Sequence, residues 1–124
     1  MKILVVDDEM DVRTLFEQRF RKEIRLKEME FAFACSGREA LMFLNQNIKE
    51  AVLILSDINM PGMSGLELLR QIKQKDYNPS PTVMMISAYG DGENYNTAMQ
   101  LGADDFLTKP VDFIALKEKL LVYN

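Results

Sequence analysis

Three short runs of this sequence are apolar at every position, and segments with the spacing of amphipathic helices separate them. The runs are Ile3–Val6, Ala51–Leu55 and Val83–Ile86. A strand that is apolar on both faces must be covered on both faces, which is typical of a parallel sheet between two layers of helices. Alternation of such strands with helical segments predicts βαβ units and an α/β fold.

Two weaker strands complete the expected sheet. In segment 28–35, Phe31 and Phe33 alternate with smaller or charged residues, which predicts a half-exposed edge strand. Cys35 has the same phase and is predicted to be a small buried residue. Segment 105–108 is the shortest strand and a suitable opposite edge. With the apolar strands inside, we expect a flavodoxin-like doubly wound five-stranded parallel sheet, order 2-1-3-4-5, with five helices.

The five expected helices carry apolar stripes and end signals. The first has a stripe that runs from Val12 to Phe20 and includes Leu15 and Phe16. A serine followed three residues later by a glutamate marks two helix starts, at residues 36 and 64. The fourth helix, near 93–101, stops at a glycine, and the fifth begins after a proline. The inward residues expected in these last two helices are Tyr95, Ala98, Met99, Phe113, Leu116 and Leu120.

The absence of histidine excludes more chemistry than any other feature of the composition. The 124 residues contain no histidine and one cysteine. Serine-histidine-aspartate triads, cysteine-histidine pairs and histidine-ligated zinc or haem are therefore excluded, and so is a disulfide within the chain. Any chemistry has to use carboxylates, hydroxyls and lysines.

The charge distribution argues against nucleic acid as a direct partner. The net charge is −4, and the basic residues of segment 19–27 are interleaved with Glu17, Glu23 and Glu28, which is typical of a solvated helix face. The first apolar run is too short for a signal peptide or a membrane span. We expect one cytoplasmic domain over residues 1–124.

Polar side chains follow or end four of the five expected strands. Asp7 and Asp8 follow the first strand, Asp57 the third, Ser87 the fourth and Lys109 the fifth. Because the carboxyl ends of parallel strands meet at one edge of an open sheet, these groups are expected to open onto one cleft.

Each of these residues also has a plain structural interpretation. Asp7 and Asp8 could cap the first helix, because aspartate is a favoured N-cap. Asp57 could end its strand in a turn, Ser87 could be a loop hydroxyl, and Lys109 could be a surface lysine. Together, however, they leave three carboxylates at one pole, where they repel each other unless a cation joins them. Mg²⁺ prefers carboxylates and water, so the set favours a magnesium-assisted phosphoryl-acceptor site.

In these residues the sequence resembles the receiver domains of response regulators in two-component signalling. The matching segments occur in order along nearly the whole chain: Val5–Glu9, Ser56–Gly65, Ser87–Ala88 and Gly102–Pro110. The resemblance implies a receiver domain, either complete or the N-terminal part of a longer protein.

The resemblance implies a role for each site residue. Asp57 would accept a phosphoryl group from a histidine of a sensor histidine kinase or histidine phosphotransfer protein. Mg²⁺ would be bound directly by Asp8 and Asp57, through water by Asp7, and by the backbone carbonyl of Asn59. Lys109 would pair with the phosphate.

The resemblance also implies a switch. The Ser87 hydroxyl would bind a phosphate oxygen and draw in the loop after the fourth strand, and Phe106 would turn inward with it. A half-buried aromatic residue equally suits an edge strand. The surface of the fourth helix, fifth strand and fifth helix would then change what it binds. A cis Lys109–Pro110 peptide would aim the lysine into the site. Asn59 and Tyr89 would tune dephosphorylation. Tyr89 could shield the acyl phosphate from water, or it could only pack on the loop.

Three other functions fit the sequence less well. A hydrolase with an aspartyl-phosphate intermediate usually has its nucleophile and acid two residues apart after the first strand, where this chain has Asp7-Asp8-Glu9. A receiver-like module that is never phosphorylated would be favoured by loss of an acidic residue or of Lys109, and all are present. A flavin or nucleotide binder needs a glycine-rich or Ser/Thr-rich phosphate loop after the first strand, which is missing.

We therefore interpret the chain as a Mg²⁺-dependent phosphoacceptor domain, and not an enzyme, that controls an output domain or a target protein. The sequence leaves open the cognate kinase, the output and whether phosphorylation makes the chain form a homodimer.

Overall fold

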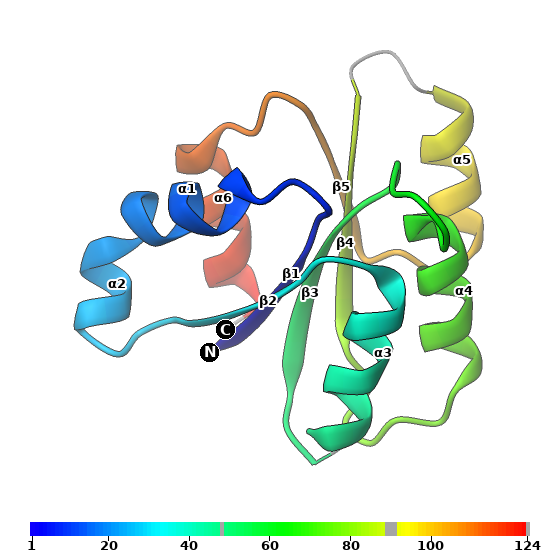
Figure 1. Cartoon of the computed structure of the whole chain (residues 1–124), viewed down its shortest axis with the longest axis horizontal. Coiled ribbons are helices and arrows are strands. Elements are labelled where there is room, and N and C mark those ends of the chain that lie inside the picture. The colour runs from blue at the N-terminus through cyan, green and yellow to red at the C-terminus, as the bar shows by residue number, and fades with distance from the viewer. Residues whose placement is uncertain (48, 89–91, 124) are drawn as a thin grey trace.

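The computed structural model describes residues 1–47, 49–88 and 92–123 and contains the predicted sheet (Figure 1). The strands are β1 (Lys2–Val6), β2 (Glu30–Ala34), β3 (Val52–Asp57), β4 (Thr82–Ser87) and β5 (Asp105–Thr108). All neighbouring strands are parallel, and their order is β2-β1-β3-β4-β5. The flavodoxin-like topology and both predicted edge strands are confirmed.

Helices cover both faces of the sheet. They are α1 (Asp11–Arg19), α2 (Arg21–Arg25), α3 (Gly37–Gln46), α4 (Gly65–Gln74), α5 (Gly92–Gln100) and α6 (Phe113–Val122). In Figure 1, α1, α2 and α6 lie on one side of the strands and α3, α4 and α5 on the other. None of the helices within the described residues is long and apolar enough to cross a bilayer.

The sheet divides the core into two layers because successive side chains of a strand point to opposite faces. Ile3 and Val5 of β1 pack with Phe16 and Phe20 on the side of α1, while Leu4 and Val6 pack on the opposite side. All four β1 side chains are at most 3% exposed. The runs without a polar face are therefore the central strands, as predicted.

The described residues form six helices, one more than the predicted five, because the first predicted helix is divided in two. The first predicted helix breaks at Phe20, where φ is −110° and ψ is 22°, so α1 ends and α2 begins at once. The Phe20 ring is nevertheless buried. Apolar spacing carries no signal of this break, because the inward stripe continues across it.

Some predicted inward positions are wrong for a related reason. Leu15, Tyr95 and Met99 are 40%, 47% and 40% exposed, whereas Ala98 is fully buried. The contact faces of α1 and α5 are narrower than their apolar stripes. Sequence spacing shows the direction of a stripe but not how much of it a neighbouring element covers.

The end of β2 overturns another expectation. Cys35 is exposed, not buried. Its phase matches that of Phe33, but β2 ends at Ala34 and Ser36 already caps α3. The Ser36 hydroxyl accepts a hydrogen bond from the Glu39 N–H at 3.1 Å, and Ser64 does the same for Glu67 at 3.2 Å. Both predicted helix starts are confirmed.

Candidate functional site

Three carboxylates meet beyond the carboxyl ends of β1 and β3. Parallel pairing sets Val6 beside Ser56, so the next residues along the two strands, Asp7 and Asp57, are neighbours. One oxygen from each of Asp7, Asp8 and Asp57 lies within 4.8 Å of the others. Asp57 is 4% exposed, while Asp8 is open to solvent. The predicted acidic cluster is therefore present.

The alternative that Asp7 or Asp8 caps the first helix does not hold. Met10 occupies the N-cap position of α1 and makes no side-chain cap bond. Asp7 instead accepts a hydrogen bond from the Glu9 N–H at 2.9 Å, which folds the loop back on itself. Both carboxylates are thus available at the cluster rather than used by the helix.

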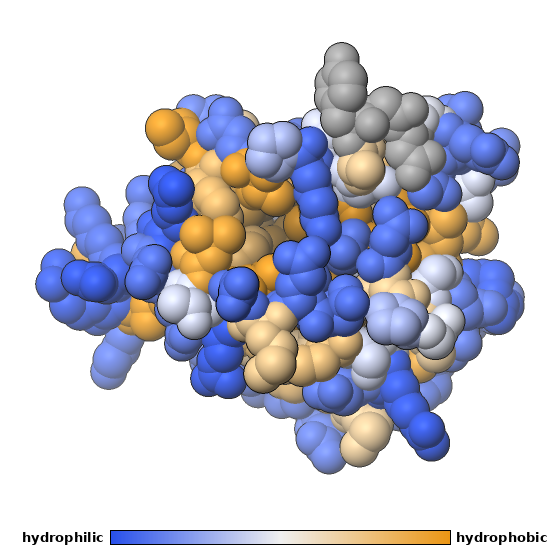
Figure 2. Space-filling model, turned by 45° about the horizontal axis from the view of Figure 1, so that its top comes forward, coloured by the Kyte–Doolittle hydropathy of each residue, from blue (hydrophilic) through white to orange (hydrophobic). Residues whose placement is uncertain are grey.

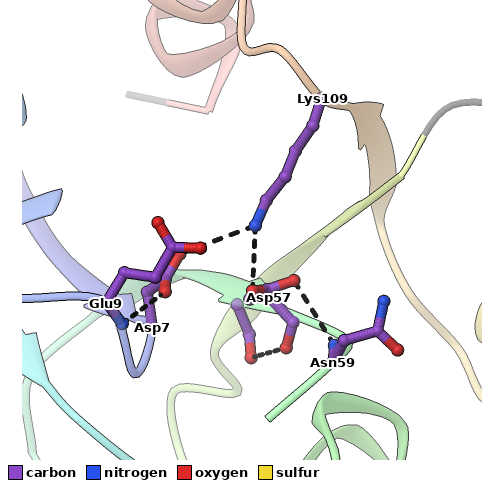
Figure 3. A network of polar contacts seen from close by, with 6 residues as sticks. Asp7, Glu9, Asp57, Asn59 and Lys109 are labelled. Carbon is purple, nitrogen blue, oxygen red and sulfur yellow. Dashed lines mark hydrogen bonds and ion pairs between the residues drawn. The ribbon is translucent and has the colours of Figure 1, made fainter.

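Lys109, the residue that follows β5, joins the cluster (Figure 3). Its Nζ lies 3.0 Å from Asp57 Oδ2 and 4.0 Å from Asp7 Oδ2. The backbone positions it, because the Lys109 N–H donates to the Ser87 carbonyl at 2.7 Å. The Lys109–Pro110 peptide is cis, as predicted. Two strands separated by β4 thus bring opposite charges together.

The charges of the cluster perturb each other. Burial raises the pKa of Asp7, as does the neighbouring Asp57 carboxylate, and together they outweigh the Glu9 hydrogen bond. For Lys109, burial alone lowers the pKa, but its hydrogen bond to Asp57 and the charges of Asp57 and Asp7 raise it above the usual value. One ammonium group therefore faces more negative charge than it neutralises.

This donor set fits a hard divalent cation. Three carboxylates that face each other and a raised Asp7 pKa are the conditions in which a cation lowers the electrostatic free energy of a site. Oxygen ligands of this kind suit Mg²⁺, which keeps several waters and takes few protein ligands. The residues present are therefore those a magnesium site needs.

The remaining predicted site residues lie around the cluster. The Asn59 N–H donates to Asp57 Oδ1 at 3.3 Å, and its side chain is exposed. Ser87 is fully buried at the end of β4, one residue beyond Ile86, the partner of Asp57 in the sheet. Tyr89 lies outside the described residues.

Phe106 stands apart from the carboxylates. Its side chain is half-buried on β5, and its ring packs edge-on against Tyr95 of α5, with 5.2 Å between the ring centroids. Through this contact, Phe106 links the edge strand β5 to α5. Sequence reasoning placed the residue on the right strand but did not foresee its aromatic partner.

An apolar hollow adjoins the charged cluster and was not predicted. Figure 2 shows orange surface inside a depression bordered by blue side chains. The cavity measures about 570 Å³ and lies between α1 and the chain that follows β5. Asp7 and Lys109 line it together with Val12, Phe16, Phe113 and other apolar residues. Its walls come from segments far apart in the sequence, so no local pattern could have revealed it.

Comparison with known proteins gives the same family from sequence and from structure. The response regulator receiver domain family matches residues 3–121. A chemotaxis protein CheY homolog from Campylobacter jejuni is 34% identical over 121 residues, which cover 97% of this chain and 89% of that protein. The receiver protein structure from Pseudomonas putida has a TM-score of 0.82 and 28% identity, and the match covers 99% of this chain and 96% of that one.

Other relatives are much longer than this chain. A cyclic di-GMP phosphodiesterase from Thermotoga maritima is 34% identical over 120 residues, which cover 97% of this chain but 30% of that protein. This chain therefore resembles one part of some relatives and most of the length of others.

Proposed function

The chain belongs to the response regulator receiver domain family, and we propose that it is a switch controlled by phosphorylation of Asp57. The observation that carries this proposal is the Lys109 ammonium 3.0 Å from the Asp57 carboxylate, beside Asp7 and Asp8. This arrangement supplies a nucleophilic oxygen together with charge that can stabilise an incoming phosphoryl group.

The proposed reaction is a phosphoryl transfer to a carboxylate. An Asp57 oxygen attacks the phosphorus of a phosphohistidine on a sensor kinase or phosphotransfer protein. The new O–P bond forms as the N–P bond breaks, and the imidazole leaves with the electron pair of that bond. The donor histidine lies outside these 124 residues, because they contain none.

Asp7, Asp8, Asp57 and the backbone carbonyl of Asn59 would hold Mg²⁺ in this proposal. The bound ion would supply positive charge opposite the phosphoryl oxygens. The residues of the chain do the rest: Asp57 provides the oxygen, and Lys109 pairs with the phosphate. Asn59 and Tyr89 would then tune how fast water removes the phosphoryl group.

We propose that the switch follows from the added charge. A phosphoryl group on Asp57 brings about two negative charges, which attract Lys109 and the Ser87 hydroxyl. When the segment that follows β4 moves, Phe106 would lose or regain its contact with Tyr95. The surface of α5, β5 and α6 would thereby change between two packings. Helices α5 and α6 are the fourth and fifth helices of the sequence prediction. Their numbers differ because the first predicted helix is divided into α1 and α2 at Phe20.

The proposed role is that of a cytoplasmic signalling domain without substrate turnover of its own beyond its phosphorylation and dephosphorylation. Its partners would be a histidine kinase or phosphotransfer protein on one side and an output domain or target protein on the other. We propose no nucleic acid or membrane contact for these residues. Any effector activity would belong to a partner or to another part of a longer protein.

Intact-mass spectrometry tests the proposal directly. The protein is incubated with acetyl phosphate in Mg²⁺ or in EDTA, as wild type, as Asp57→Asn and as the control Asp105→Asn, whose carboxylate pairs with Lys119 outside the cluster. We expect one phosphoryl increment that requires Mg²⁺ and is lost only in Asp57→Asn. If the domain accepts phosphate only from its kinase, acetyl phosphate would give no increment. Binding of beryllofluoride, measured by NMR, tests the site in that case. Failure of both tests would leave the unphosphorylated binding module as the better function.

A further inference from the structure

Within the described residues, no strand pairs with the outer edge of β2. The Glu30 N–H donates to the Met1 carbonyl at 2.8 Å, and the Ala34 carbonyl accepts from the Asp7 N–H at 3.0 Å, so both residues face the β1 side. Backbone groups alternate in direction along a strand. The N–H and C=O groups of Phe31 and Phe33 therefore point away from β1, and β2 is the last strand of the sheet on that side.

Within the described residues, β2 contains no lysine, proline or bulge that would oppose strand pairing. Proteins commonly cover such edges or interrupt them with lysine, proline or a bulge. The sequence of β2 is Glu-Phe-Ala-Phe-Ala, and its register with β1 is continuous over all five pairs. Its three central residues, Phe31, Ala32 and Phe33, are partly open to solvent. The edge is therefore chemically ready to accept another strand.

A small groove lies beside this edge. It measures about 240 Å³ and is lined by Phe33 and Ala34 of β2 and by residues of α3, namely Glu39, Met42, Phe43 and Gln46. Met42 is 55% exposed, although it is apolar. A groove of this size holds one large apolar side chain. In strand addition, backbone hydrogen bonds provide affinity, and such a groove selects the side chain.

Charge distinguishes between the occupants of this edge. Glu30 begins β2, and Glu39 lies near its end, where the Cys35 N–H donates to Glu39 Oε1 at 3.4 Å. A second copy of the chain paired antiparallel about Ala32 would bring its Glu30 to the end that carries Glu39. Like charges opposite each other destabilise a strand pair. Two cations lie near these ends, and each has another carboxylate partner. Lys2 is 3.9 Å from Glu30 but 3.0 Å from Glu50. Arg13, whose guanidinium lies over the Phe33 ring, pairs with Glu17 at 3.6 Å. Glu30 and Glu39 therefore favour a strand with basic residues at both ends.

We propose that β2 accepts an extended segment of a partner protein as a sixth strand of the sheet. The segment places one large apolar side chain in the groove beside Met42 and Phe43. Its basic residues face Glu30 and Glu39. This surface is separate from the carboxylate cluster and does not depend on phosphorylation of Asp57.

The test uses the full chain and the peptide acetyl-Lys-Val-Thr-Leu-Thr-Val-Lys-amide. Variants of the peptide carry Phe or Met at the centre, Glu in place of both Lys residues, or N-methyl groups on alternate amides. Binding is measured by calorimetry, and amide hydrogen exchange by NMR. We expect the best Lys-flanked peptide to slow exchange of the Phe31 and Phe33 amides at least tenfold. The Glu-flanked and N-methylated forms should bind at least tenfold more weakly.

A charge swap provides the matched control. Glu39→Lys should favour the Glu-flanked peptide, while Glu118→Lys, on the exposed side of α6, should leave the preference unchanged. Equal binding of Lys-flanked and Glu-flanked peptides would overturn the proposal, as would no binding of any peptide at millimolar concentration. Dimers in sedimentation velocity with the Phe31 and Phe33 amides already protected would show that a second copy occupies the edge instead.

Discussion

A Cβ atom on Gly65 would lie 2.0 Å from the carbonyl oxygen of Asp57 and 2.8 Å from the Cα of Ile58. The Gly65 N–H also donates to the Ile58 carbonyl at 2.8 Å. Both crowded atoms belong to the backbone, so rotation of a side chain cannot relieve the contact. The first turn of α4 can therefore rest against the end of β3 only because residue 65 is glycine.

Gly65→Ala should consequently disturb Asp57 as well as stability. We expect a loss of about 1–3 kcal/mol in the free energy of unfolding, typical of overpacking, measured by urea denaturation. The phosphorylation rate should fall because the acceptor carboxylate moves. Gly92→Ala is the control, since no described atom lies within 4 Å of its Cβ position. Equal stability of the two variants would refute the steric argument.

Asp7→Asn should stabilise the protein when Mg²⁺ is absent. Burial and the Asp57 carboxylate raise the pKa of Asp7, which means that its charged form is unfavourable in the folded state at neutral pH. Removal of that charge should increase the free energy of unfolding in EDTA by about 0.5–2 kcal/mol, a usual gain when a functional site is relaxed. A thermal melt in EDTA checks this, and a lower melting temperature would contradict it.

The same variant should lose most of the stabilisation that Mg²⁺ gives to wild type. An ion that binds only the folded state at 100 times its Kd contributes about 2.7 kcal/mol. In Asp7→Asn a neutral amide replaces one of the three carboxylates of the cluster, so the melting temperature should hardly respond to Mg²⁺. An unchanged response would remove Asp7 from the proposed ion site.

Lys109→Met should slow both the gain and the loss of the phosphoryl group. The ammonium lies 3.0 Å from Asp57, where it can stabilise charge in either direction of transfer. We expect each rate to fall about tenfold or more. Mass spectrometry at a series of times measures both rates. Lys119→Met is the matched control, because Lys119 pairs with Asp105 at 2.9 Å outside the cluster. Rates in Lys109→Met within twofold of this control would show that Lys109 has no role in transfer.

The cluster could be predicted from the sequence because its members depend on topology alone. Once β1, β3 and β5 are parallel strands of one sheet, with β4 between β3 and β5, the residues that follow them must lie at the same edge. The contact between Gly65 and Asp57, the break at Phe20 and the exposure of Cys35 could not be predicted in this way. Each depends on how closely two packed elements approach, and hydrophobic spacing contains no information about that distance.

Tyr77→Phe should be neutral or stabilising. The side chain is buried, and within the described part of the chain its hydroxyl has no hydrogen-bond partner. A buried hydroxyl without a partner costs about 1–3 kcal/mol. Its removal leaves the ring in place, so the free energy of unfolding in urea should rise or stay the same. A loss above about 1 kcal/mol would reveal a hydrogen bond to an ordered water.

The ion pair between Glu23 of α2 and Lys117 of α6 should make stability depend on pH. Glu23 is 6% exposed, and its carboxylate lies 2.5 Å from the Lys117 ammonium. The hydrogen bond from Lys117 lowers the pKa of Glu23 below its usual 4.5, and Glu23 in turn raises the pKa of Lys117. A carboxylate whose pKa is lower in the folded protein than in the unfolded protein stabilises the fold at pH values above the unfolded-state pKa. This stabilisation is lost as the pH falls through the folded-state pKa.

Wild type should therefore lose stability below about pH 4.5, where the unfolded carboxyl groups begin to take up protons. Glu23→Gln should be less stable than wild type at neutral pH and should approach it as the pH falls, because the variant has no carboxylate to protonate. Glu118→Gln is the control. It changes an exposed glutamate of α6, the helix that contains Lys117, and its stability should follow the wild-type pH curve. Urea denaturation at a series of pH values measures all three proteins. A constant gap between wild type and Glu23→Gln across the acid range would mean that the pair does not act through its charge.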